Sequence, residues 1–362
     1  MHLWSQRFDR EMTDVFAIQD EISAAIADQL RVSLAETPAA ARAPTKVAAY
    51  EAFLEGQYHW NKITPQGFQK ALECYGRALA IDPGYAPAYA GMAQSYIMPG
   101  QSGMVEPRPF LLKARAAAER ALALDADLAE AHAMLGASIA LLDYDWAASE
   151  RHFLRALELN PSSFHVWGPY STFWLAPQGR VDEALAGFDR VLELDPLNLL
   201  ADFSKGLFLL HGRKYEAAAV EIRKGLDLNP GFPVARNVLA TVYAFQGKSE
   251  EALSMAQREV QLSGGQPRSL WMMGLVLAIT GRAEEARRVL EDLQGLGRDS
   301  YVNPVQVASI YAQLGEKDAA FEWVEKAIEQ RVNMLMLKAS PIWDPLRSDP
   351  RYTALLRRMN LA

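Results

Sequence analysis

The sequence repeats itself with a period of about 34 residues. Three segments end in Leu-x-Leu, then Asn or Asp, then proline, at Pro161, Pro196 and Pro230, which lie 35 and 34 residues apart. A fourth segment ends in a similar way at Asp82-Pro83. Self-similarity at a fixed period is typical of arrays in which each repeat packs on its neighbours. The chain is therefore expected to stack short units in a row.

The residues before each proline predict a helix with a defined packing face. Spacings of four and three residues separate Ala71, Tyr75 and Ala78, which places all three on one side of a helix. Small residues there let neighbouring helices approach closely, and the aromatic ring fills the space between them. An Asp or Asn that precedes proline is pushed out of the helical region, so each of these helices should end there.

A glycine marks the middle of the later units. Gly247, Gly281 and Gly315 stand 34 residues apart, each between two apolar runs, and would permit a turn with positive φ between two helices. Ala, Leu, Glu and Arg dominate the chain, whereas runs of β-branched residues are scarce. Half of the 362 residues are hydrophobic, which excludes general disorder. These features predict an all-α protein.

Composition also excludes several classes of function. A net charge of −7 argues against nucleic acid as a partner, because nucleic-acid binding needs a clustered basic face. The single cysteine, Cys74, cannot form an intrachain disulfide and is expected to serve in packing. The six histidines show no metal-binding spacing, and no phosphate-binding glycine loop or GxSxG elbow occurs. We therefore expect no cofactor, no metal and no catalytic activity.

These residues resemble the tetratricopeptide-repeat (TPR) family. The family pattern places a large residue, Leu-Gly and an aromatic in a first helix, and Ala, an aromatic, Ala and Pro in a second. Tyr89, Met92-Ala93 and Tyr96 look like the first half. The resemblance implies a right-handed superhelix, an α-solenoid, of about eight helix-turn-helix units over residues 49–334, whose job is to hold another protein or peptide. The expected units are 49–85, 86–128, 129–163, 164–198, 199–232, 233–266, 267–300 and 301–334. Extra residues between Met98 and Pro109 predict a protruding loop.

The C-terminal residues 335–362 leave the repeat. Asp344-Pro345 and Asp349-Pro350 each combine an N-cap residue with proline at the first helical position. The apolar side of the final helix would cover the exposed face of the last repeat. We expect a C-terminal cap.

The N-terminal residues have another character. Residues 1–34 predict a short strand and a helix, and 35–48 form a linker rich in Ala and Pro. The run from His2 to Ile22 is similar to the end of a TolB-like domain in multidomain bacterial signalling proteins, where a TPR array follows and the effector is often a class III adenylate/guanylate cyclase or a winged-helix regulator. This resemblance implies an alternative function, the regulatory or sensory arm of such a protein. An unpaired strand further predicts a homodimer through residues 3–34, or a fold-back in which the N-terminal helix fills the groove.

Location follows from what the sequence lacks. No stretch approaches the ~20 uncharged apolar residues that span a bilayer, so no membrane insertion is expected. The start has no apolar core of the kind a signal peptide needs. We expect a cytoplasmic protein, or a periplasmic one if the chain is part of a membrane-anchored parent.

The first helices of a TPR superhelix line its groove, and register predicts which residues face it. The expected partner-binding residues are Phe53, Trp60, Gln94, Phe203, Leu207, Asn237, Thr241, Phe245, Arg268, Trp271 and Leu275. This mixture is apolar and aromatic, and aromatic anchors carry much of the energy of typical interfaces. The alternative is that about half of them pack between adjacent units. A clamp for a peptide carboxylate is not expected, because only Asn237 and Arg268 approach the required pattern.

Overall fold

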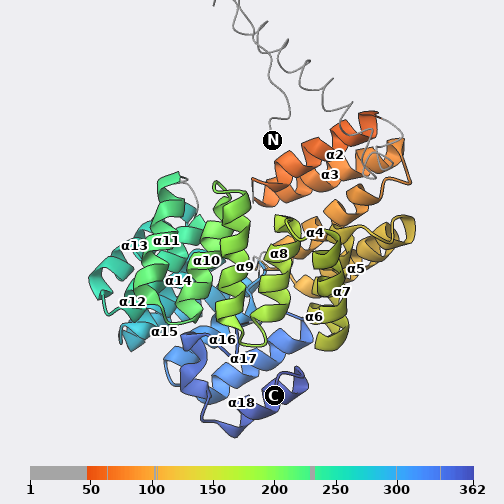
Figure 1. Ribbon diagram of the computed structural model, residues 1–362. Coiled ribbons are helices and arrows are strands. Elements are labelled where there is room, and N and C mark those ends of the chain that lie inside the picture. The colour runs from red at the N-terminus through yellow and green to blue at the C-terminus, as the bar shows by residue number, and fades with distance from the viewer. Residues whose placement is uncertain are drawn as a thin grey trace, which may run out of the picture. The chain divides into compact units, whose positions relative to one another are not determined.

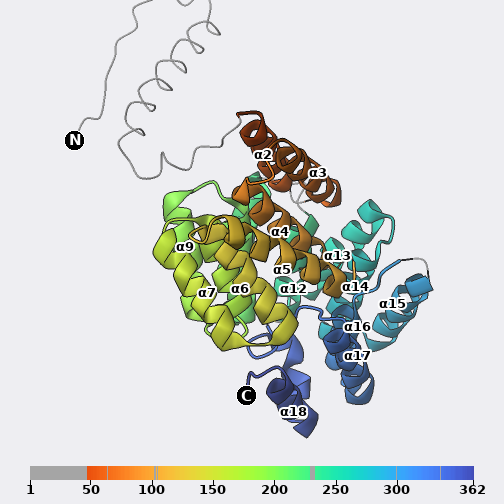
Figure 2. The same ribbon diagram turned by 90° about the vertical axis from the view of Figure 1, so that its right-hand side faces the viewer.

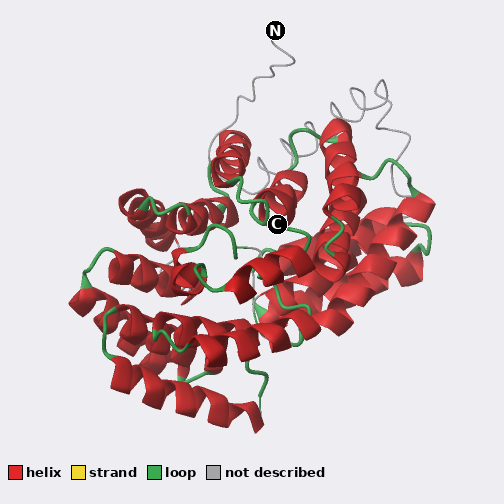
Figure 3. Cartoon of the chain, turned by 90° about the horizontal axis from the view of Figure 1, so that it is seen from below, coloured by secondary structure: helices red, strands yellow, loops and turns green. Residues whose placement is uncertain are grey.

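The computed structural model describes residues 47–362 apart from 63, 102, 104, 229–232, 299 and 335. Within this part of the chain every regular element is a helix and no strand occurs (Figures 1 and 3). Residues Ala48–Ala362 form one compact unit. The predicted all-α solenoid is confirmed. The expected strand, helix and linker of residues 1–46 lie outside the described residues.

The helices follow one another as antiparallel pairs. The first helices are α2 (Val47–Trp60), α4 (Ala86–Gln101), α6 (Ala129–Asp143), α8 (Phe164–Tyr170), α10 (Leu199–His211), α12 (Pro233–Phe245), α14 (Pro267–Ile279) and α16 (Pro304–Gln313). The second helices are α3 (Pro65–Ile81), α5 (Pro107–Leu124), α7 (Trp146–Leu159), α9 (Val181–Leu194), α11 (Tyr215–Leu228), α13 (Ser249–Ser263), α15 (Ala283–Gly295) and α17 (Lys317–Glu329). Each first helix packs on its own second helix, and successive first helices pack on each other.

The turns within the pairs use the glycines that the sequence singles out. Gly247, Gly281 and Gly315 have φ of +76°, +80° and +76°, a backbone region that L side chains rarely adopt. The predicted positive-φ turn is therefore confirmed at these three positions. In two earlier units a non-glycine residue adopts this conformation, Tyr144 with φ of +54° and Arg213 with φ of +63°.

The core of the first unit shows why the pattern combines small and large residues. The Tyr75 ring is 1% exposed and lies between Gly56 of α2 and Gly91 of α4. A Cβ atom would come within 2.5 Å of the ring at Gly56 and within 2.6 Å at Gly91. Any side chain at either position would push the helices apart, so these glycines permit the close approach of three helices.

The predicted protruding loop between Met98 and Pro109 is wrong. Helix α4 continues through Pro99, which lies inside it, and ends at Gln101, while α5 already begins at Pro107. The extra residues therefore lengthen the helices and leave only a short connection. Gly100 packs directly against Pro107, where an added Cβ would lie 2.6 Å from the Pro107 Cβ. This packing accommodates a proline that would otherwise end the helix.

The fourth unit departs from regular α-helix. Helix α8 contains Pro169 and passes directly into a π-helical turn, Ser171–Leu175, in which the Ala176 N–H donates to the Ser171 carbonyl. Proline has no N–H to donate, so the backbone ladder is interrupted at this point. The predicted kink at Pro169 takes the form of this change in helix type.

The two ends of the compact unit differ. Helix α2 keeps a row of exposed apolar side chains at helical spacing: Val47, Tyr50, Leu54 and Tyr58. After α17 the chain forms a 3-10 helix, Pro341–Leu346, and then α18, Pro350–Arg358. Tyr352 and Leu355 of α18 are buried. Figure 2 shows α18 beyond α17, with the C-terminus returning towards α6 and α7.

Candidate functional site

The first helices enclose a cavity with a volume of about 410 Å³. All eight contribute to its lining, from Trp60 of α2 to Val305 and Ser309 of α16. The remaining wall comes from the segment after α17, including Met334, Met336, Ser340, Ile342 and Trp343. We call this segment, residues 333–346, the closing segment. The inner face of the array is thus partly filled by the chain itself.

Most of the residues expected to face the groove line this cavity. Nine of the eleven do so: Trp60, Gln94, Phe203, Leu207, Asn237, Thr241, Arg268, Trp271 and Leu275. The other two pack elsewhere. Phe53 contacts the rings of Tyr75 and Tyr85, with centroids 5.7 and 5.5 Å away. Phe245 stacks on Tyr215 at 5.6 Å with an interplanar angle of 6°.

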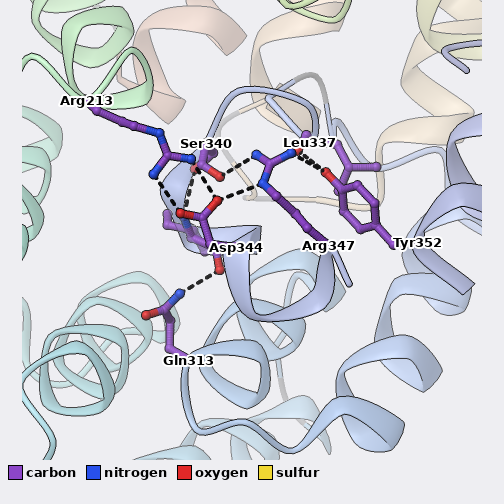
Figure 4. Close-up of polar contacts among 8 residues, drawn as sticks. Arg213, Gln313, Leu337, Ser340, Asp344, Arg347 and Tyr352 are labelled. Carbon is purple, nitrogen blue, oxygen red and sulfur yellow. Dashed lines mark hydrogen bonds and ion pairs between the residues drawn. The ribbon is translucent and has the colours of Figure 1, made fainter. Parts of the chain in front are cut away.

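An ion-pair network fastens the closing segment to the fifth unit (Figure 4). Asp344 accepts from both terminal nitrogens of Arg213, at 2.6 and 2.8 Å, and from Arg347 Nε at 2.7 Å. Arg347 also donates to the Ser340 carbonyl and to the Tyr352 hydroxyl. Arg213, and secondarily Arg347, lower the pKa of Asp344 against the opposing effect of burial. The carboxylate therefore stays ionised and holds the segment at neutral pH.

Two further contacts extend this closure to the last residues. Gln313 Nε2 donates to the Ile342 carbonyl at 2.7 Å, which joins α16 to the closing segment (Figure 4). The Trp146 indole N–H donates to the Met359 carbonyl at 2.7 Å, across 213 sequence positions. The Asn360 side chain donates to the Tyr144 carbonyl at 3.1 Å. The C-terminal residues thus contact the third unit as well as the last one.

The wall of the cavity carries a few polar groups among apolar ones. The Trp271 indole N–H donates to the Ser309 hydroxyl at 2.9 Å, and Gln94 lies 3.1 Å from a ring nitrogen of His165. Arg268 lines the cavity, and burial lowers its pKa to about 10. Burial also lowers the pKa of His211 to about 4, so this imidazole is neutral at pH 7.

A second cluster of chemically active groups lies between α2 and α3. Among the described residues, Glu55, His59 and Cys74 alone place three ligand-type atoms within 4.8 Å of one another. The structure thus brings a histidine to a thiol that the sequence assigns to packing. The Arg77 guanidinium already occupies this position, 2.5 Å from a Glu55 oxygen and 3.2 Å from the Cys74 sulfur. A cation at the centre disfavours a metal ion there.

Sequence reasoning missed the closing segment as part of the cavity. Met334, Met336 and Trp343 lie beyond the last repeat, and nothing in the local pattern connects them with α10 or α14. His211 was also missed, although it stands at the last position of α10, one turn beyond Leu207. Extending the helical spacing of Phe203 and Leu207 by four residues would have found it.

Comparison with known proteins agrees with this helix pairing. Models of the tetratricopeptide repeat match residues 233–258, 267–292 and 305–331. The first two matches begin with α12 and α14 and extend into the second helices of those pairs, and the third covers α16 and α17. This chain carries tetratricopeptide repeats. The fold of such TPR arrays is typically non-catalytic, and their usual role is to support contacts between proteins.

Individual proteins share parts of the TPR array. The transcriptional regulator HilA of Salmonella typhimurium is 27% identical over 154 residues, which are 42% of this chain and 27% of the regulator. The putative adenylate cyclase 3 of Rhizobium meliloti is 33% identical over 95 residues, or 25% of this chain and 16% of the cyclase. The chain thus spans about a quarter or less of the length of these relatives.

Solved structures support the fold alone. A human IFIT1 dimer with m7Gppp-AAAA superposes with a TM-score of 0.56 at 17% identity, over 79% of this chain and 72% of that one. A search for membrane spans within the described residues found no helix that combines the necessary length with the necessary apolar character.

Proposed function

We propose that this TPR array is a non-catalytic scaffold that binds a protein or peptide segment on the inner face formed by its first helices. The supporting observation is the cavity itself, because helices from all eight units contribute side chains to one apolar surface. Phe203, Trp271 and Leu275 supply the broad apolar contacts that anchor a bound segment. The partner is expected to be a polypeptide, with no nucleic acid involved.

Selection from a random peptide library against the immobilised full chain tests this function. Peptides rich in apolar residues should be enriched, and Phe203→Ala or Trp271→Ala should weaken their binding by about tenfold or more. Leu154→Ala is the matched control, because Leu154 is 46% exposed on the outer helix α7 and does not line the cavity. Peptides that bind all three variants as tightly as the parent chain would show that the inner face is not the binding surface.

A second candidate function is that the array forms the regulatory arm of a bacterial signalling protein. The specific support is that two relatives with similar stretches are named as a transcriptional regulator and a putative adenylate cyclase. In this arrangement, binding on the inner face would control an effector domain. Sequencing the DNA on both sides of the coding region tests the idea. An in-frame cyclase or DNA-binding domain supports it, and stop codons on both sides count against it.

A homodimer through residues 3–34 is a further proposal that rests on the sequence alone. Sedimentation of the full chain, compared with a chain that lacks residues 1–40, provides the test. A dimer that persists without these residues would place the interface elsewhere.

A further inference from the structure

The cavity wall has one charged group and no charge of opposite sign beside it. Among the described lining residues, Arg268 alone carries a formal charge, because no Asp, Glu or Lys lines the cavity and His211 is neutral at pH 7. Arg268 lies at the start of α14, and its Nε atom is shielded from solvent. A guanidinium on an otherwise apolar wall attracts an anion strongly, because little water remains to screen it.

The charges behind the wall leave an excess of one positive charge. Glu259 of α13 is 5% exposed and accepts from Arg236 Nε at 2.8 Å. The same carboxylate attracts Arg268 and opposes the lowering of its pKa by burial. Two guanidinium groups therefore share one buried carboxylate. An anionic group inside the cavity would balance the remaining charge.

Two buried polar atoms point to the same cavity. Asn237 is 2% exposed and His211 is 8% exposed, and both line the cavity. No group within the described part of the chain forms a hydrogen bond with Asn237 Oδ1 or His211 Nδ1. Buried polar atoms in folded proteins normally have a partner, from the protein, from ordered water or from a ligand. These two atoms are accordingly available to a molecule bound in the cavity.

The size and walls of the cavity favour a small molecule. A volume of about 410 Å³ lies within the range of small-molecule sites, which are mostly apolar with a few placed polar groups. The closing segment forms one side of it and is fastened by Asp344 to Arg213. An extended polypeptide would have to displace that segment, whereas a compact ligand would not.

We propose that the cavity binds a small organic acid, with its carboxylate at Arg268 and its apolar body between Phe203, Leu207, Trp271 and Leu275. A polar substituent on the acid would meet Asn237 and His211. The assignment goes beyond the scaffold function, because it concerns a small ligand and holds whether or not a polypeptide also uses the inner face. Where both bind, the acid would compete with peptide for the same surface.

Calorimetric titration of the full chain with decanoate tests the proposal, with decanol as a neutral analogue of the same chain length. We expect decanoate to bind about tenfold or more tightly than decanol, because a charge-assisted bond to a guanidinium is stronger than a neutral one. In Arg268→Met this preference should disappear, while both ligands still bind through the apolar wall. Arg258→Met is the matched control, because Arg258 is exposed on α13 and does not line the cavity.

Three results would overturn the proposal. They are no binding of decanoate, equal affinity for decanoate and decanol, and an unchanged preference in Arg268→Met. If Arg268→Met fails to fold, as judged by its circular dichroism, Phe203→Trp provides the second test, because a larger ring narrows the cavity and should weaken both ligands. A negative result with decanoate does not affect the peptide selection described above, so the two proposals can fail separately.

Discussion

The substitution Trp146→Phe tests whether the C-terminus closes onto the middle of the array. The Trp146 indole N–H donates to the carbonyl of Met359, a residue that is 1% exposed. Phenylalanine keeps an aromatic ring at this position but has no N–H group. The change therefore removes one long-range hydrogen bond and leaves most of the local packing in place.

The size of the effect follows from the carbonyl left behind. A buried acceptor that loses its donor costs about 1–3 kcal/mol. If that free energy holds the C-terminal residues closed, their opening becomes roughly 5- to 150-fold more frequent, since 1.36 kcal/mol corresponds to a factor of ten. Hydrogen exchange measured by mass spectrometry should show faster exchange of the α18 amides by a factor in this range. Exchange in α13 and α15, which lie in other units, should stay unchanged.

A matched variant separates this closure from a general loss of stability. The Trp167 indole N–H also donates to a backbone carbonyl, that of Pro161 at 2.9 Å, but across only six positions and at an exposed site. Trp167→Phe should leave exchange in α18 unaffected. The reasoning is refuted if Trp146→Phe accelerates exchange in α7 alone, or if both variants affect α18 equally.

Three further predictions concern stability. The pKa of His211 falls from 6.5 to about 4 on folding because the ring is buried, so the unfolded state binds a proton first as the pH drops; His211→Gln should abolish a loss of about 3 kcal/mol between pH 6.5 and 4, measured by urea denaturation. Gly206→Ala should destabilise the fold by about 1–3 kcal/mol, because its Cβ would lie 2.4 Å from Ile222 Cγ1, whereas Gly225→Ala, with nothing within 4 Å, should stabilise it by up to about 1 kcal/mol, both read from the thermal midpoint. Asp344→Asn should cost at most about 1 kcal/mol, because the pair is partly exposed, and high salt should reduce the difference from the parent chain.

The sequence predicted the helix pairs well because their signals are local. Asp195 lies directly before Pro196, and α9 ends at Leu194, just before this dipeptide. Gly281 has the positive φ expected of it. Such signals depend on a few neighbouring residues and do not require knowledge of the rest of the fold. Pro99 shows the limit of this reasoning, because its packing partner lies in the next helix.

The closure could not be predicted in the same way. Arg213 and Asp344 are 131 residues apart, and many other arginines and aspartates in the chain have equally suitable side chains. Which of them meet depends on the small rotations of every unit between them, and these rotations accumulate along the array. The residues facing the cavity were easier to place, since helical spacing within one unit decides them, but the segment that covers them was not.

Backbone conformation supports the view that this closure is a built feature of the array. Within the described residues, the non-glycine positions with positive φ are Tyr144, Arg213, Arg331 and Asn360. All four join the C-terminal part of the array to earlier units or lie in contact with those junctions: Arg331 lies over the Tyr144 ring at 4.7 Å, Asn360 donates to the Tyr144 carbonyl, and Arg213 holds Asp344.

Each of these conformations costs of order 1–3 kcal/mol for a residue with a side chain and persists only where the surroundings hold it. Glycine would remove that cost, as it does at Gly247, Gly281 and Gly315 in the units that do not contact the C-terminus through this turn. A side chain at such a position must therefore contribute contacts that glycine lacks. The ion pair, the cation–π contact and the amide hydrogen bond are those contacts, which is why the costly turns and the closure occur at the same residues.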